Sequence, residues 1–316
     1  MKTKAQNKIT ITVHETNKII LRIAGKDTMS IDWGDETKVK TYQLRDEPPS
    51  TYTHIYTGTS AHAITITGGD ITHLICQKQD VTNLDVTRNT GLKELYCSNN
   101  KITELDLSKN TALTYLSCYN NQLTNLDLRN NRLLRILGCP GNNLTNLDIS
   151  GDAKLTHLFC TGNQLKSLDI SKNTKLTVCD CSYNQLTSMD VSQNADLDYL
   201  NCSKNRLSSL NTGNNTDLRV LFCDKNCLTG FDASRNTSLV WLIINENQIS
   251  TDEINALFRT LPFGEENIIC IEKNPGADGC DKSIVESKGW EIIDYNIYLP
   301  ESKNKVIRMV IDEYCF

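Results

Sequence analysis

Cysteine recurs every 21 residues through the middle of the chain. Apolar residues, mostly leucine, precede it at fixed distances, and an asparagine follows three residues later, as in Leu92, Leu95, Cys97 and Asn100. Eight of the thirteen cysteines share this spacing: Cys76, Cys97, Cys118, Cys139, Cys160, Cys181, Cys202 and Cys223. No insertion or deletion interrupts the register before Asn247. Such a period predicts a solenoid, in which each unit buries its apolar face against its neighbours.

Each unit is expected to contain one short strand. Side chains alternate along a strand, so Leu95 and Cys97 would face inward while Tyr96 points outward. Successive strands would lie parallel, about 4.8 Å apart. Asn100 is expected to turn inward and bond backbone groups, because its amide is both donor and acceptor. Leu105 and Leu107 would fill the opposite side of the core.

The pattern L-x-x-L-x-C-x-x-N resembles the signature of leucine-rich repeats. The 21-residue unit is similar to the short bacterial, internalin-like class, and the resemblance covers residues 71–250. It implies a curved solenoid with its parallel strands on the concave face. It also implies a non-catalytic protein that binds macromolecules at the bacterial surface.

Residues 1–70 lack the repeat and predict a small all-β sandwich. Runs such as "KITITV", "KIILRI" and "HAITITG" are separated by turn residues. The segment "DWGDET", followed by "HIYTG" and "AITITG", resembles the polycystic-kidney-disease (PKD) type of immunoglobulin-like domain. The order around Trp33 differs from the usual motif of that family, and Glu36 replaces a glycine.

Residues 251–316 predict a C-terminal cap that contains helix. "STDEINALFRTL" has Ser250 or Thr251 as N-cap and a helical spacing of apolar residues. "IICIEKN" predicts a displaced further repeat strand, "CDKSIVESKGWEII" a helix and strand, and "KVIRMVIDEY" one more strand. The expected fold is therefore mainly β with some helix (α+β), with a leucine-rich repeat solenoid at its centre.

The regular cysteines predict packing rather than chemistry. Neighbouring Cβ atoms about 4.8 Å apart are too distant for a disulfide, and a linear stack lacks the tetrahedral geometry of a metal site. The cysteines that recur every 21 residues are called the cysteine column, and the asparagines three residues after them the asparagine column. Ile244 occupies the position 21 residues after Cys223, and Cys179 occupies a position at which the other repeats have leucine. Cysteine and aliphatic residues are therefore interchangeable here, as expected for small buried apolar side chains.

Two sets of aspartates raise the question of cation binding. One set recurs with the repeat: Asp85, Asp106, Asp127, Asp148, Asp169, Asp190 and Asp232, with Asn211 at the missing position. The other is Asp32 and Asp35. Both could hold a cation, but acceptance of turn amides is favoured, since Asn211 provides the same geometry without charge. The sequence contains no familiar catalytic fingerprint, and no cofactor is expected.

The outward positions of the repeat strands are the candidate binding residues, because the repeat does not dictate them. Aromatic residues make up 6% of the chain and gather at these positions. Contiguous exposed aromatic surface marks interaction sites. The predicted ligand-binding residues are Tyr96, Tyr115, Tyr119, His157, Phe159, Asp180, Tyr199, Arg219, Phe222 and Trp241.

The charge and hydropathy of the chain restrict the classes of partner and the location that we expect. The chain has 33 basic and 38 acidic residues and a net charge of −5, without a basic block, which argues against nucleic acid. Its longest apolar run, at residues 239–244, is too short to span a bilayer. The N-terminus lacks the continuous apolar core of a secretory signal. The resemblance implies an extracellular or surface location, with a cytoplasmic one as the alternative, and a monomer is expected.

The favoured function is non-catalytic binding of a protein or glycan on the concave face. One alternative is an enzyme or effector that uses the repeats as a substrate-binding arm, with Cys270 or Cys280 as the reactive group. The other is a structural spacer or self-association module.

Overall fold

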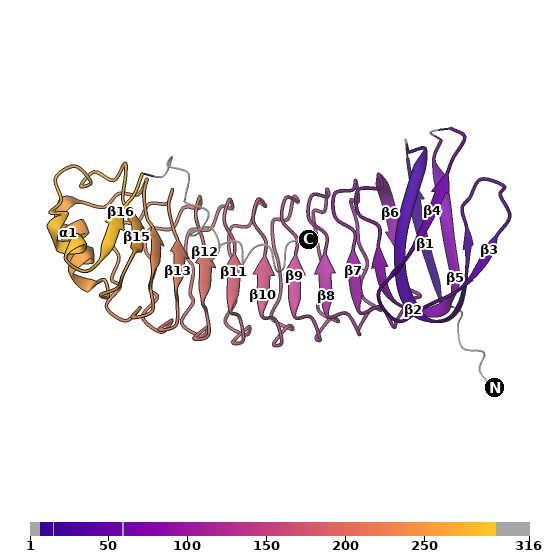
Figure 1. Ribbon diagram of the computed structural model, residues 1–316, viewed down its shortest axis with the longest axis horizontal. Helices are drawn as coiled ribbons and strands as arrows, with labels where there is room; N and C mark the ends of the chain where they lie inside the picture. The colour runs from indigo at the N-terminus through magenta and orange to yellow at the C-terminus, as the bar shows by residue number, and fades with distance from the viewer. Residues whose placement is uncertain (1–6, 15, 59, 295–316) are drawn as a thin grey trace. The chain divides into compact units, whose positions relative to one another are not determined.

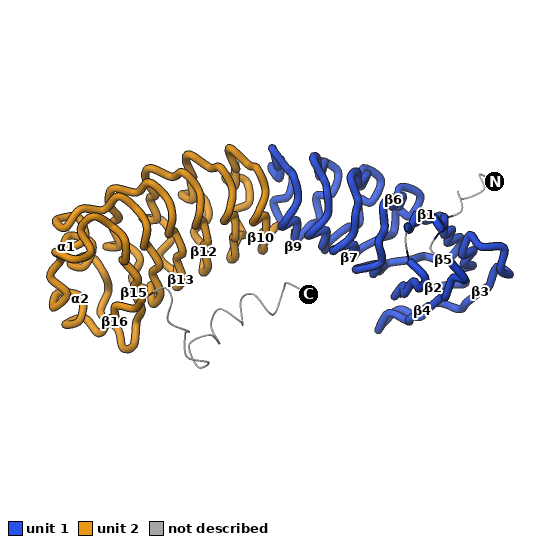
Figure 2. Tube along the Cα trace, turned by 90° about the horizontal axis from the view of Figure 1, so that it is seen from above, with its two compact units in different colours: residues 1–154 blue, residues 155–316 orange. Residues whose placement is uncertain are grey.

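The structure is a computed structural model that describes residues 7–14, 16–58 and 60–294. The chain divides into two compact units, residues 1–154 and 155–316 (Figure 2). The strand predicted within residues 305–314 lies outside the described residues.

The first unit begins with antiparallel strands formed by the β-rich runs of the sequence. These are β1 (Lys8–Val13), β2 (Lys18–Asp32), β3 (Lys40–Gln43), β4 (Ser50–Ile55), β5 (His62–Ile75) and β6 (Val81–Asp85) (Figure 1). β1 pairs with β5 and β6, while β2 pairs with β3, β4 and β5. Alternating apolar residues, among them Ile9, Ile11 and Val13, are buried.

The residues of the PKD-like motif pack against one another in this region. His54 stacks on Trp33 with ring centroids 4.9 Å apart, and the Tyr56 hydroxyl donates to the Trp33 carbonyl at 2.9 Å. His54 Nε2 lies 2.5 Å from Asp35 Oδ2. The motif thus forms part of a packed core around the buried Trp33.

β5 joins the antiparallel region to the repeats without a break. Its last residues, His73–Ile75, pair in parallel with β7 (Glu94–Tyr96) on one side and antiparallel with β2 on the other, while its earlier residues pair antiparallel with β1 and β2. The expected boundary between residues 70 and 71 therefore falls within one strand. β8 (Tyr115–Ser117) and β9 (Ile136–Gly138) continue the parallel array of the first unit.

The second unit has the same parallel arrangement. Its strands are β10 (His157–Phe159), β11 (Val178–Asp180), β12 (Tyr199–Asn201), β13 (Val220–Phe222), β14 (Trp241–Ile243), β15 (Asn267–Cys270) and β16 (Trp290–Ile292) (Figure 1). From β10 to β14 each residue pairs with the residue 21 positions later, as Tyr199 does with Val220. Leu242 then pairs with Ile269, so the displaced repeat strand predicted in "IICIEKN" is confirmed.

Two series of asparagines hold the turns between strands. Asn121 Nδ2 donates to the carbonyls of Cys97 and Cys118, and its Oδ1 accepts from the Ile102 amide. This confirms the role expected for the asparagine column. A second series, which the repeat pattern L-D-L-S-x-N contains but to which no role was assigned from the sequence, is fully buried: Asn89, Asn110, Asn131, Asn173, Asn194, Asn215 and Asn236. Most repeats therefore use two amide side chains to satisfy their buried backbone, and one repeat has Asp152 at the second position.

The helix predicted after the regular repeats is present as α1 (Thr251–Thr260). Ser250 is its N-cap and accepts from the Glu253 amide, and Ile254, Leu257 and Phe258 form its buried face. A short helix, α2 (Ser283–Glu286), precedes β16. No helix in the described ranges is long and apolar enough to cross a bilayer.

Candidate functional site

The cysteine column is a packing feature. All eight members are fully buried, and every cysteine among the described residues is a free thiol. Burial raises the pKa of the Cys76 and Cys139 thiols to about 12. A thiol that stays protonated is a poor nucleophile and a poor metal ligand. No group of acidic, cysteine or histidine side chains within the described chain is arranged to hold a metal ion.

The repeating aspartates are turn residues. Asp106 Oδ1 accepts from the Ser108 amide at 2.8 Å, and Asn211 Oδ1 accepts from the Gly213 amide at 2.9 Å in the same position. Asp32 and Asp35 likewise accept from amides two residues on, those of Gly34 and Thr37. The interpretation of both sets as turn-stabilising side chains is confirmed.

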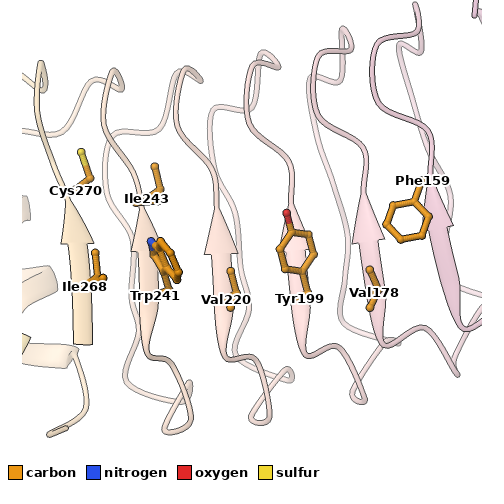
Figure 3. Packing of buried hydrophobic residues seen from close by; sticks show 8 residues of the cluster. All are labelled: Phe159, Val178, Tyr199, Val220, Trp241, Ile243, Ile268 and Cys270. Atoms are coloured by element: carbon orange, nitrogen blue, oxygen red, sulfur yellow. The ribbon is translucent and has the colours of Figure 1, made fainter. Parts of the chain in front are cut away.

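In the second unit, the outward side chains of the strands form one apolar surface, the unit 2 patch. It consists of Phe159, Val178, Tyr199, Val220, Trp241, Ile243, Ile268 and Cys270, lying along successive strands (Figure 3). Phe222 packs against it and meets Tyr199 and Trp241 edge-on, with both pairs of centroids 5.8 Å apart. Every member of the patch is no more than 5% exposed.

This burial differs from the expectation for three predicted binding residues. Phe159, Tyr199 and Trp241 stand at outward positions, but they are buried rather than exposed. Phe222 is partly buried. The outward direction of a side chain follows from strand alternation, whereas its exposure also depends on what covers the strand. These aromatic residues are therefore not open anchors in the described structure.

The three polar residues predicted in this region have different surroundings. Asp180 accepts from the Ser182 amide and hydroxyl at 3.0 and 2.6 Å, and burial raises its pKa. Burial lowers the pKa of half-buried His157. Arg219 makes a bidentate ion pair with Asp198, in which Nε and Nη2 each lie 2.5 Å from a carboxylate oxygen. Only Arg219 is largely exposed.

In the first unit, the outward strand positions carry a half-exposed aromatic and acidic surface, the unit 1 patch, defined as Tyr96, Tyr115, Tyr119, Glu94 and His73. Tyr96 and Tyr115 stack with centroids 4.6 Å apart, and the Tyr96 hydroxyl donates to Glu94 Oε2 at 2.9 Å. His73 Nε2 lies 3.5 Å from Glu94 Oε1. The tyrosines and Glu94 all retain part of their surface in solvent.

His73 and Glu94 were missing from the predicted set. His73 pairs directly with Glu94 across β5 and β7, so it occupies the same outward column one repeat earlier. Counting back 21 residues from Glu94 would have identified it. A second carboxylate, Glu47 Oε1, lies 3.3 Å from His73 Nε2. The patch thus combines stacked phenol rings with acidic groups and one imidazole.

The comparisons with known proteins agree with this architecture. A family model for leucine-rich repeats in two copies matches residues 90–130. The chain is similar to the functional domain of InlJ from Listeria monocytogenes, which includes a cysteine ladder, with 32% identity and a TM-score of 0.61. The alignment covers 71% of this chain and 55% of that one, so the chain spans about half the length of that domain.

Two further solved structures are similar to parts of the chain at lower identity. The ectodomain of the plant receptor kinase GASSHO1/SCHENGEN3 from Arabidopsis thaliana, solved with CASPARIAN STRIP INTEGRITY FACTOR 2, is 24% identical with a TM-score of 0.53, over 63% of this chain and 26% of that one. Internalin C2 from Listeria monocytogenes is 20% identical with a TM-score of 0.43, over 59% and 76%. No curated protein sequence matches the chain.

Fold and comparisons together define a protein built on leucine-rich repeats. The described repeats are similar to those of the InlJ domain.

Proposed function

We propose that the protein is a non-catalytic receptor for a protein or glycan, and that it recognises this ligand on the outward side of its repeat strands. The observation that carries the proposal is the unit 1 patch. Inward positions of each repeat are fixed by packing, whereas Tyr96, Tyr115 and Tyr119 occupy outward positions that the fold leaves free. Partly exposed tyrosines that gather on one face mark a recognition surface.

The chemistry of the unit 1 patch suits a ligand with apolar rings or sugar faces and hydrogen-bond donors. The stacked phenols offer a rigid apolar platform, and Tyr side chains lose little conformational entropy on binding. Glu94 and Glu47 offer carboxylate acceptors beside it. The remaining predicted residues stand at or beside the outward strand positions of the second unit. The partly exposed His157, Asp180, Phe222 and Arg219 are proposed as further ligand contacts, whereas Phe159, Tyr199 and Trp241 are buried.

The proposal includes display at the bacterial surface, with residues 1–70 as a PKD-like spacer domain. The likeness to the InlJ domain and the mutual packing of Trp33, His54 and Tyr56 support it. The proposal also takes the receptor to be a monomer.

The enzyme alternative gains no support from its candidate thiols. Cys270 is fully buried, and burial raises the pKa of Cys280. A raised pKa keeps the Cys280 thiol mainly protonated at neutral pH, and the burial of Cys270 keeps it from contact with a substrate. No observation favours a purely structural spacer over a receptor.

Binding of the labelled chain to arrays of purified extracellular protein domains and of glycans tests the proposal. For each hit, the double variant Tyr96→Ala/Tyr115→Ala is expected to lose binding. The matched control is Tyr183→Ala, which removes a tyrosine that is 55% exposed and lies outside the repeat strands. Hits that survive the double variant unchanged would contradict the placement of the ligand on the unit 1 patch.

A further inference from the structure

Two carboxylates of the first unit converge on one imidazole beside the tyrosines of the unit 1 patch. Glu94 comes from β7, whereas Glu47 lies in the segment between β3 and β4. Their Oε1 atoms lie 3.5 and 3.3 Å from His73 Nε2, and His73 Nδ1 lies 2.9 Å from the Thr72 hydroxyl. The His73 side chain is only 11% exposed, so a nearly buried ring holds both carboxylates in place.

The imidazole cannot satisfy both carboxylates. Nε2 carries at most one hydrogen, whereas an ionised carboxylate offers about four lone-pair sites. Glu94 accepts one further bond, from the Tyr96 hydroxyl. No lysine or arginine among the described residues lies within ion-pair distance of either carboxylate. Negative charge and acceptor sites therefore remain open to a ligand, since the side chains of Glu47 and Glu94 are 71% and 32% exposed.

The stacked rings of Tyr96 and Tyr115 stand next to these carboxylates. Both rings keep part of their surface in solvent. Burial, together with the charges of Glu94 and Glu47, raises the pKa of Tyr96, so both carboxylates act on this ring. The face of an aromatic ring is the negative end of its quadrupole and attracts cations, as a carboxylate does. Rings and carboxylates thus form one surface that favours a positive charge.

A guanidinium group matches both parts of this surface. It is planar, so it can lie flat on a phenol ring while the N–H groups at its edge donate to carboxylates. It has five donors and no acceptor, which complements a surface rich in acceptors. The ammonium group of lysine is a compact charge that lacks this planar fork. An arginine side chain is therefore the protein group that fits the surface best.

Charge complementarity favours a basic protein over a glycan. An acidic sugar would be repelled by Glu47 and Glu94, and by the net charge of −5 on the whole chain. A neutral sugar can stack on the rings and donate hydroxyl groups, but it leaves both carboxylates without a counter-charge. A positively charged partner is attracted over a distance and gains the charged contacts on arrival.

We propose that the ligand of the unit 1 patch is a protein that presents an arginine side chain, with its guanidinium stacked on the tyrosine pair and donating to Glu94 and Glu47. The inference rests on the proposed receptor function and specifies the chemical class of its ligand. His73 is a positioning residue, because it holds the two carboxylates beside the rings.

Selection of a random peptide library on the immobilised full chain tests the proposal. The selected peptides should contain arginine at a shared position. Replacement of that arginine by citrulline, an uncharged analogue of nearly the same shape, should weaken binding by about tenfold. Binding should also weaken as the salt concentration is raised, because the contact is partly exposed. Equal binding of the citrulline peptides would overturn the proposal.

Variants of the chain test the same contact from the side of the receptor. Glu47→Gln/Glu94→Gln should lower the affinity for the selected peptides by about tenfold, with an unchanged circular dichroism spectrum. The matched control Glu36→Gln/Glu104→Gln removes the same charge at exposed positions outside the unit 1 patch and should bind like wild type. An equal loss of affinity in both double variants would overturn the proposed contact, since only the net charge would then matter.

The double variant Tyr96→Ala/Tyr115→Ala separates the arginine inference from the receptor function on which it rests. Arginine-free peptides or neutral glycans that bind the wild type and not this variant would overturn the inference alone. Arginine peptides that bind this variant as well as the wild type would overturn both, because the ligand would then lie elsewhere. A peptide selection and a glycan array that both yield no ligand would also overturn both.

Discussion

Tyr96 and Tyr115 stack across β7 and β8, with ring centroids 4.6 Å apart and planes 26° from parallel. The hydroxyl of Tyr96 is fixed at the same time by Glu94, at 2.9 Å. Cross-strand aromatic pairs of this kind stabilise a sheet and restrict the rotamers of both rings. The pair thus contributes to stability while remaining half-exposed to a ligand.

A double-mutant cycle should show that the two stacked rings stabilise the folded protein jointly. In a double-mutant cycle of Tyr96→Ala and Tyr115→Ala, we expect a coupling free energy of about 0.5–1.5 kcal/mol in urea unfolding. Tyr119→Ala combined with Tyr115→Ala serves as the control. A coupling energy no larger than that of the control pair would show that the stacking contributes nothing to stability.

Substitution of a cysteine in the column by serine should destabilise the protein more than substitution by alanine. Cys118 is fully buried among apolar side chains, so Cys118→Ser would place a hydroxyl where water cannot reach it. We expect a loss of about 1–3 kcal/mol in the free energy of unfolding, larger than the loss for Cys118→Ala. Urea unfolding of both variants measures the order. Equal losses would argue that polarity at this position is unimportant.

The same burial should protect the column from alkylation. Burial raises the pKa of the Cys118 thiol well above its ordinary value, whereas Cys227 is exposed on the surface. After brief treatment of the native protein with iodoacetamide, mass spectrometry of a pepsin digest should show Cys227 modified and Cys118 intact. Treatment in urea should modify both, which confirms that the thiols were protected by folding. Rapid labelling of Cys118 in the native state would contradict the packing role.

The repeat made most of the architecture predictable, because each inward position recurs with one residue type and one period. Leu95 and Cys97 are buried as expected, and Asn100 bonds the backbone as expected. His73 belongs to an outward column, but its position before the first regular repeat concealed it. The burial of Trp241 could not be predicted, since alternation along a strand determines the direction of a side chain and carries no information about how completely that side chain is covered.

One position breaks the second asparagine series. Asn131 Nδ2 donates to the carbonyls of Leu107 and Asn110, and the same geometry one repeat later would direct the side chain at 152 toward the carbonyls of Leu128 and Asn131. That residue is Asp152, which is fully buried. Burial raises its pKa to about 7, with a smaller contribution from the charge of Asp148. An ionised carboxylate cannot donate to a carbonyl, so this repeat depends on protonation.

Asp152→Asn should therefore stabilise the protein, and more so at high pH. Because the folded-state pKa lies above the ordinary value of 3.8, the folded protein holds the extra proton between about pH 4 and 7, and stability is lost as the pH rises through 7. The amide removes this titration and restores the donor, for an expected gain of about 1–3 kcal/mol at pH 8 and a smaller gain at pH 5. Urea unfolding at both pH values measures the difference. Asp106→Asn, at an exposed turn where the amide and hydroxyl of Ser108 lower the pKa of the carboxyl, is the control and should give no gain. An Asp152→Asn gain that is equal at both pH values would show that this carboxyl does not titrate in the folded protein.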